Sequence, residues 1–280
     1  LCLQRYGSPI YVKHQIVHNP YVVAELERKG AITVEDVAEI PAGSRVVFSA
    51  HGSPPEDFEK AAELNLTVID AVCPLVTRVH NEAKKYHREG KQVLLVGHRG
   101  HQEVRGTMGQ VPMTLVDDAA NSEPPSWDTQ SEVAVLTQTT LSVSDTANAI
   151  KAIQDRFPNA VVRTDICYAT TNRQLAVKKI APVCDIIFVI GSKNSSNSLR
   201  LVEVAKRSGC QNTFLVNSEK ESKISDILKY KNIGITSGAS APEKLVFDLI
   251  NKIKNSAKVE LNEIEVAKEK VSFKLPKILN

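Results

Sequence analysis

Two cysteines occupy positions where a thiolate is chemically useful, at the junction between an apolar run and a polar helical pattern. Cys73 follows the apolar run 66–69 and directly precedes Pro74, a residue that helices tolerate at their first position. Cys167 likewise lies just before a helical pattern, over 170–179. Backbone N–H groups at a helix N-terminus favour a thiolate, so both cysteines are candidates for thiolate chemistry such as metal binding. For either cysteine alone, simple packing of a small side chain is the alternative.

The surroundings of the two cysteines repeat, which favours a shared role. An apolar strand pattern ends in a glycine 24 residues after each cysteine, at Gly97 and at Gly191. The cysteines themselves are 94 residues apart, a period longer than that of solenoid proteins, so each repeat has the size of a domain. An incomplete third copy opens the chain, with strand patterns over 10–13 and 46–49.

The incomplete copy has no cysteine in register. Aligning Lys13 with Gly97 and Gly191 places its cysteine twelve residues before Leu1, and Cys2 is out of register. Three thiolates from three equivalent loops suit an iron–sulfur cubane that keeps one iron open for substrate. Zinc is the alternative, since it also accepts cysteine and histidine ligands. With two cysteines in register, we expect the printed chain not to hold a stable cluster.

Several histidines fall in loops that follow strand patterns, where imidazoles can bind anions or move protons. Glu103 lies two residues after one of them and is a candidate proton donor; a solvated loop carboxylate is the alternative. The loop histidines are His18, His51, His98 and His101.

Hydroxyl and amide side chains fill three further loops at strand ends. Short polar side chains at helix N-termini bind phosphate through their own groups and the backbone N–H groups. N-capping is the alternative, above all for Asn197 and Ser240. The recurrence of such loops at equivalent ends of one repeat favours a diphosphate or similar anion. The residues are Gln138, Thr139, Thr140, Ser195, Ser196, Asn197, Ser237 and Ser240.

The composition of the chain argues against some kinds of binding partner and indicates a cellular compartment. The 280 residues are 42% hydrophobic, enough for a core, and the net charge of +3 is too small to argue for a nucleic-acid partner. No apolar run approaches the roughly 18 residues of a membrane span, so no membrane partner is expected. Five widely spaced cysteines without a signal-peptide pattern predict a reducing compartment, the cytoplasm. A plastid stays open, because a segment upstream of Leu1 is expected.

Strand and helix patterns alternate along the whole chain, which predicts an α/β fold with small, mostly parallel sheets. Parallel sheets bind ligands at the carboxyl ends of their strands, where the loops described above all fall. The repeat predicts three pseudo-equivalent α/β units arranged around a central cavity, with the histidine and hydroxyl loops facing it. The predicted units are 1–72, with a tail over 265–280 that returns to it, 73–166 and 167–255.

Some local predictions concern the elements between these loops. We expect Ser144 or Asp145 to cap the helix that follows Gln138, and a charged helix over 219–229. Residues 97–103 and 117–131 are expected to be loops, and the alternation over 271–275 predicts a short strand.

Taken together, these residues resemble the LytB/IspH family, the 4-hydroxy-3-methylbut-2-enyl diphosphate reductases. The matching stretches span nearly the whole chain and are highly specific as a set. They include Tyr11-Val12-Lys13-His14, Val17-His18-Asn19, Phe48-Ser49-Ala50-His51-Gly52, Cys73-Pro74-Leu75-Val76-Thr77, Gly97-His98-Arg99-Gly100-His101-Gln102-Glu103-Val104, Thr137-Gln138-Thr139-Thr140-Leu141-Ser142, Asp165-Ile166-Cys167-Tyr168-Ala169-Thr170-Thr171-Asn172-Arg173-Gln174, Gly191-Ser192-Lys193-Asn194-Ser195-Ser196-Asn197-Ser198 and Gly238-Ala239-Ser240-Ala241-Pro242.

The resemblance implies an iron–sulfur reductase that removes the substrate's hydroxyl with two electrons and yields isopentenyl and dimethylallyl diphosphate. Glu103 would deliver the proton and Thr139 would orient the substrate hydroxyl. Electrons would come from a ferredoxin, a flavodoxin or a similar donor. The 4Fe–4S cluster would be held by Cys73 and Cys167, and the diphosphate by His18, His51, His101, Ser195, Asn197 and Ser240.

One departure from the family keeps other interpretations open. The family's opening stretch, a first strand and a glycine-rich turn with the first cluster cysteine, is absent from the printed sequence. The chain could therefore be a truncated, non-catalytic copy that keeps the anion pocket and has lost the cluster. A zinc hydrolase that uses Cys73 and the loop histidines is a third hypothesis.

Overall fold

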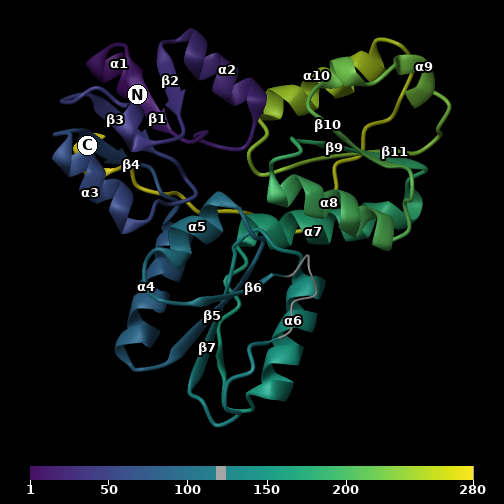
Figure 1. The fold of residues 1–280 in the computed structure, drawn as a ribbon. Helices are drawn as coiled ribbons and strands as arrows, with labels where there is room; N and C mark the ends of the chain where they lie inside the picture. Colours follow the sequence, from purple (N-terminus) through teal and green to yellow (C-terminus); the bar gives the residue numbers. More distant parts are fainter. Residues whose placement is uncertain (118–123, 280) are drawn as a thin grey trace. The chain divides into compact units, whose positions relative to one another are not determined.

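The computed structural model describes residues 1–117 and 124–279 and contains three separate sheets, all of them parallel (Figure 1). This confirms the predicted α/β class with small parallel sheets. The chain forms two compact units, so the finer division into three repeat units stays a prediction. Unit 1 comprises 1–17, 25–166 and 272–280, and unit 2 comprises 18–24 and 167–271.

The first sheet belongs to unit 1 and has the strand order β2-β1-β3-β4. Alternate side chains of its strands enter two cores, because neighbouring residues of a strand point to opposite faces. Val46 and Phe48 pack with α3 and η1 on one face, and Val12 packs with α1 on the other. The elements are α1 (Cys2–Tyr6), β1 (Ile10–Lys13), α2 (Pro20–Arg28), β2 (Ala31–Val34), η1 (Val37–Glu39), β3 (Arg45–Phe48), α3 (Pro55–Glu63) and β4 (Thr67–Asp70).

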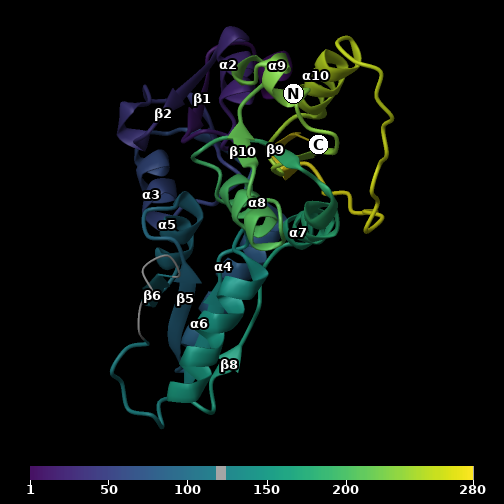
Figure 2. The same ribbon diagram turned by 90° about the vertical axis from the view of Figure 1, so that its right-hand side faces the viewer.

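The second sheet, also in unit 1, has the order β6-β5-β7-β8. Leu95 faces the core formed with α4, and its neighbour Leu94 faces the core formed with α6. Figure 2 shows α6 running along this sheet, so helices cover both faces, as the continuous apolar strands require. The elements are α4 (Pro74–Arg88), β5 (Gln92–Gly97), α5 (Gln102–Met108), β6 (Thr114–Asp117), β7 (Val133–Thr137), α6 (Val143–Arg156) and β8 (Val161–Val162).

The third sheet forms the core of unit 2 and has the order β10-β9-β11. Ile187 and Val189 pack against α7 and α8, whereas Phe188 and Ile190 pack against α9 and α10. Cys210 is buried among the first group, as expected for a packing residue. The elements are α7 (Tyr168–Ile180), η2 (Ala181–Val183), β9 (Ile186–Ile190), α8 (Ser196–Arg207), β10 (Thr213–Val216), η3 (Glu219–Glu221), α9 (Ile224–Ile227), β11 (Ile233–Ser237) and α10 (Glu243–Lys254), and η4 (Lys277–Leu279) follows in the part of the chain assigned to unit 1.

Several local predictions were wrong, each where distant contacts outweigh local pattern. Ser142, not Ser144 or Asp145, caps α6 through a 3.3 Å bond from the N–H of Asp145. The predicted loop 97–103 runs into helix α5, and the charged helix over 219–229 is broken into η3 and α9.

The predicted surface loop over 117–131 begins with the last residue of strand β6, and residues 118–123 lie outside the described residues. Residues 271–275 form no strand. Of the tail predicted over 265–280, only 272–280 is assigned to unit 1, where Arg5 and Tyr6 donate to the carbonyl of Ile278. Within the described ranges, no helix is both long and apolar enough to span a membrane.

Candidate functional site

Glu103 is a buried acid in the first turn of α5, not a solvated loop carboxylate. Its side chain is 3% exposed. Thr139, in the loop after β7, donates its backbone N–H to Oε1 at 2.6 Å, and its hydroxyl lies 2.9 Å from Oε2. Glu103 and Thr139 are thus in direct double contact in unit 1, and their roles in proton delivery and substrate orientation stay predictions.

The environment of Glu103 keeps its proton bound near neutral pH. Burial is the main cause and raises the pKa from 4.5 to about 7, with a smaller contribution from the charge of Asp165. The two bonds from Thr139 oppose this shift, because they favour the carboxylate. The protonated acid keeps both contacts, since the Thr139 hydroxyl can donate or accept. A carboxyl group with a pKa of about 7 is suited to general acid catalysis.

Gln138 connects the loops around Glu103 through hydrogen bonds. It is 1% exposed, accepts the N–H of His98 at 3.0 Å and donates to the Thr140 hydroxyl at 2.9 Å. A Cβ at Gly97 would lie 2.7 Å from the Val104 side chain, so glycine permits the close approach of β5 and α5. Gln138 and Thr140 thus support each other, and substrate contact by either stays a prediction.

Two of the predicted histidines lie side by side in unit 1. The rings of His51 and His101 are 5.9 Å apart between centroids and nearly perpendicular, at 82°. His101 caps α5: its Nδ1 accepts the N–H of Glu103 at 3.2 Å. The Nδ1 of His51 lies 3.2 Å from the Ser49 hydroxyl. The pair therefore offers two imidazoles immediately beside the buried acid's helix.

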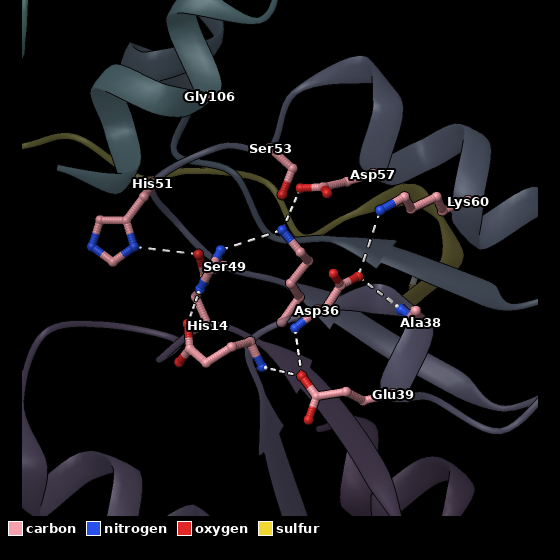
Figure 3. A network of polar contacts seen from close by, with 12 residues as sticks. His14, Asp36, Ala38, Glu39, Ser49, His51, Ser53, Asp57, Lys60 and Gly106 are labelled. Carbon is pink, nitrogen blue, oxygen red and sulfur yellow. Dashed lines mark hydrogen bonds and ion pairs between the residues drawn. The ribbon is translucent and has the colours of Figure 1, made fainter. Parts of the chain in front are cut away.

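A polar network behind this loop was not predicted from the sequence (Figure 3). Lys13, 1% exposed at the end of β1, forms an ion pair with buried Asp57 of α3 and lies 3.3 Å from Nε2 of His14. His14 Nδ1 contacts Glu35 at 2.6 Å. Burial and the neighbouring Lys13 charge lower the pKa of His14, although Glu35 opposes this. The only sequence signal was a polar pair at a strand end.

In unit 2, the ends of β9 and β11 are joined through the backbone of His18. Its carbonyl oxygen accepts from the Ser192 hydroxyl at 2.6 Å and from the Ser240 hydroxyl at 3.1 Å. Ser240 therefore does not cap α10, whose N-cap is Pro242. Three segments that are far apart in the sequence meet here, and Ser192 is a member that the sequence analysis did not single out.

The N-terminus of α8 carries a buried amide, that of Asn197, which is 3% exposed. Among the residues that the structure describes, neither its Oδ1 nor its Nδ2 has a hydrogen-bond partner. The cap of this helix is Ser195, whose hydroxyl accepts from the N–H and the hydroxyl of Ser198, so the capping alternative was wrong for Asn197. Buried polar groups are rarely left unpaired, so this amide indicates a ligand site beside Ser196 and the helix N-terminus.

Both predicted cluster cysteines are the N-cap residues of helices, and both are partly exposed. The thiol of Cys73, in unit 1, makes no capping bond. The thiol of Cys167, in unit 2, accepts the N–H of Thr170 at 3.3 Å. Accessible sulfurs at helix N-termini fit the thiolate donors of an iron–sulfur cluster. Within either unit, the described residues contain no group of three metal-binding side chains, so ligation stays a prediction.

The comparisons with known proteins agree over almost the whole chain. Residues 2–254 match the model of the family described as LytB protein. A 4-hydroxy-3-methylbut-2-enyl diphosphate reductase from Streptomyces avermitilis is 47% identical, over 99% of this chain and 83% of the relative. The one from Beijerinckia indica is 48% identical, over 99% and 89%.

Solved structures give the same result. The E-1-hydroxy-2-methyl-but-2-enyl-4-diphosphate reductase of Plasmodium falciparum has a TM-score of 0.95 at 35% identity, over 99% of this chain and 89% of that one. A second (E)-4-hydroxy-3-methyl-but-2-enyl diphosphate reductase, described as the terminal enzyme of the non-mevalonate pathway, has a TM-score of 0.63 at 31% identity and 91% coverage of both chains. The fold, the buried acid and the family match agree: this chain is an enzyme that belongs to the LytB family.

Proposed function

We propose that this enzyme reduces 4-hydroxy-3-methylbut-2-enyl diphosphate to isopentenyl and dimethylallyl diphosphate, a step of isoprenoid biosynthesis. The observation that carries the proposal is the buried Glu103, whose pKa of about 7 and double contact with Thr139 suit a proton donor to a hydroxyl leaving group. The names of the curated relatives support the substrate and the reaction.

The reaction needs two electrons and two protons. The allylic C–O bond breaks, and the hydroxyl leaves as water after it gains one proton. The electron pair and the second proton remain on the carbon chain, which keeps its diphosphate. Glu103 donates the proton to the departing hydroxyl, and Thr139, which contacts both carboxyl oxygens, orients that hydroxyl toward the acid.

In this proposal, uncharged imidazole, amide and hydroxyl groups bind the diphosphate, rather than exposed cationic side chains. We propose that the rings of His51 and His101, and the amide of Asn197 at the N-terminus of α8, are diphosphate donors. The unsatisfied Asn197 amide and the partial positive charge of a helix N-terminus both favour an anion. His18, Ser195, Ser196, Ser240, Gln138 and Thr140 complete the proposed set.

Cys73 and Cys167 are the proposed ligands of a 4Fe–4S cluster, which supplies the two electrons one at a time when it is bound. The electrons come from a small redox protein such as a ferredoxin or a flavodoxin. The thiol of Cys184 packs on the core of unit 2, and burial raises its pKa, so it is not proposed as a ligand.

The experiment combines binding with turnover. The repeat places a third cluster cysteine twelve positions before Leu1, so turnover is tested on a chain extended upstream with that cysteine. After anaerobic reconstitution with iron and sulfide, this extended chain should consume the hydroxy-diphosphate in the presence of a low-potential reductant, and mass spectrometry should detect both alkenyl diphosphates. Calorimetry should show that Asn197→Ala weakens substrate binding at least tenfold, whereas Asn251→Ala, exposed on α10, does not.

Two results would count against the proposal. Binding without any reduction would instead assign the chain the role of a non-catalytic diphosphate-binding protein. Absence of binding would reject the proposed anion site altogether.

A further inference from the structure

The two side-by-side histidines of unit 1 are each held through Nδ1. For His101 the direction of the bond is certain, because its partner is the backbone N–H of Glu103, which can only donate. The Nδ1 of His101 is therefore an acceptor, and in the neutral ring the proton resides on Nε2. His101 can present an N–H donor to an anion without carrying a charge.

The partner of His51 is a side-chain hydroxyl, so the identity of the partner does not by itself fix which group donates the hydrogen bond. Figure 3 shows the His51 ring turned toward Ser49, whose hydroxyl lies 3.2 Å from Nδ1. A serine hydroxyl can donate or accept. If it accepted, Nδ1 would carry the proton of the neutral ring and Nε2 would present a lone pair, which repels a diphosphate oxygen. If it donates, Nε2 carries the proton and matches His101.

The loop that carries the two residues is fixed against rearrangement. Ser49 is 1% exposed, and its carbonyl accepts the N–H of Gly52 at 3.3 Å. Gly52 has φ +82°, which favours glycine, and its carbonyl oxygen would lie 2.6 Å from a Cβ at Gly106 of α5. Beneath the loop packs the ring of His80, whose pKa burial lowers to about 4. The Ser49 hydroxyl therefore has little freedom to leave His51.

We propose that Ser49 is a positioning residue for the diphosphate site: its hydroxyl donates to Nδ1 of His51 and so places the proton of that ring on Nε2. His51 and His101 then form a pair of neutral Nε2–H donors of the same tautomer. The proposal rests on the proposed function, because only an anionic ligand requires both rings to donate. It explains why a buried hydroxyl lies at the end of β3, directly before the loop.

The test uses the whole chain labelled with ¹⁵N-histidine, with inorganic pyrophosphate as the probe. Long-range ¹H–¹⁵N spectra at about pH 8, above the usual histidine pKa, distinguish the two neutral tautomers. A His51→Gln variant assigns the His51 signals. We expect the Nε2–H form for His51 and His101 in the wild type, and a mixture of tautomers for His51 alone in Ser49→Ala.

Pyrophosphate binding gives the second measurement. Ser49→Ala should raise the Kd about 3- to 10-fold, the effect of one lost hydrogen bond, and Ser49→Thr, which keeps the hydroxyl, should restore both the tautomer and the Kd. Ser53→Ala is the matched control, a buried serine of the same loop whose backbone carbonyl, rather than its hydroxyl, accepts from Gln110.

The outcomes separate this inference from the proposed function. If the wild type does not bind pyrophosphate, the proposed anion site fails. If the wild type binds and Ser49→Ala keeps both the Nε2–H tautomer and the wild-type Kd, Ser49 does not position His51. An Nδ1–H form in the wild type would overturn the direction of the bond.

Discussion

Glu103 combines three properties of a proton donor: burial, a hydroxyl partner and a pKa close to neutral pH. Its position in α5 explains all three, because the helix turns the carboxyl into the protein toward Thr139. His101 begins the same helix and accepts the N–H of Glu103, so the acid and one proposed diphosphate donor share a rigid element. A change at Glu103 can therefore remove the proton without moving the anion site.

We predict that Glu103→Gln lowers turnover about 10²- to 10⁴-fold, the usual contribution of a general acid. The amide keeps the shape of the side chain and can still accept the N–H of Thr139, so pyrophosphate binding should stay within a factor of about two. Steady-state kinetics and calorimetry measure the two effects. Glu89→Gln, an exposed residue at the C-terminus of α4, is the control, and a fully active Glu103→Gln would exclude the acid role.

The pH dependence of stability gives a separate prediction for Glu103. Its pKa is about 7 in the folded protein against 4.5 for the exposed group, so the folded state holds the proton more tightly. The corresponding stabilisation is complete below pH 4.5 and is lost as pH rises through 7, a difference of about 3 kcal/mol.

Urea unfolding of wild type and Glu103→Gln across this range measures that difference. The wild type should lose stability relative to the glutamine variant as pH rises, since glutamine has no proton to release. Parallel stability curves for the two proteins would show that Glu103 titrates normally in the folded state.

At the scale of elements, α3 is tied to the end of β1 by a buried ion pair. Lys13 and Asp57 are 1% and 4% exposed, and helix N-termini favour an acidic residue such as Asp57 in their first turn. Removing one partner of a buried pair leaves an uncompensated charge. We predict that Asp57→Ala lowers the free energy of unfolding by about 3–5 kcal/mol, measured by urea denaturation.

A surface pair supplies the comparison. Lys244 and Asp248 form an exposed i,i+4 pair on α10, and water already solvates both charges. Asp248→Ala should change stability little. If the two alanine variants were equally stable, the Lys13–Asp57 pair would contribute no more than a surface contact.

At the scale of the whole molecule, each compact unit has its own apolar cores. In unit 2, Leu249 of α10 is fully buried against the third sheet, whereas Phe247, two residues away, is 55% exposed. We predict that Leu249→Ala lowers the stability of unit 2 by about 2–5 kcal/mol through the cavity it leaves. Amide hydrogen exchange in β9 measures this, with Phe247→Ala as the control; equal protection in both variants would contradict the burial pattern.

Local pattern predicted the alternation of strands and helices and several of the helix starts. Asn19 accepts the N–H groups of Tyr21 and Val22 at the start of α2, and Cys167 caps α7. Capping and proline signals act within a few residues, so they can be recognised in the sequence. The cap of α6 was misplaced because Ser142 and Ser144 satisfy the same local rule, and Ser142 is the one that is buried.

By itself, the sequence determined that the fold is α/β with parallel sheets and that the chemical residues lie at strand ends, since both follow from periodicity and residue type. Only the tertiary structure decided which of these residues meet. Glu103 and Thr139 are 36 residues apart, and Lys13 and Asp57 are 44 apart. Such contacts depend on the register of neighbouring strands, which no short-range pattern encodes. Burial, which sets the pKa of Glu103, arises only when those strands pack.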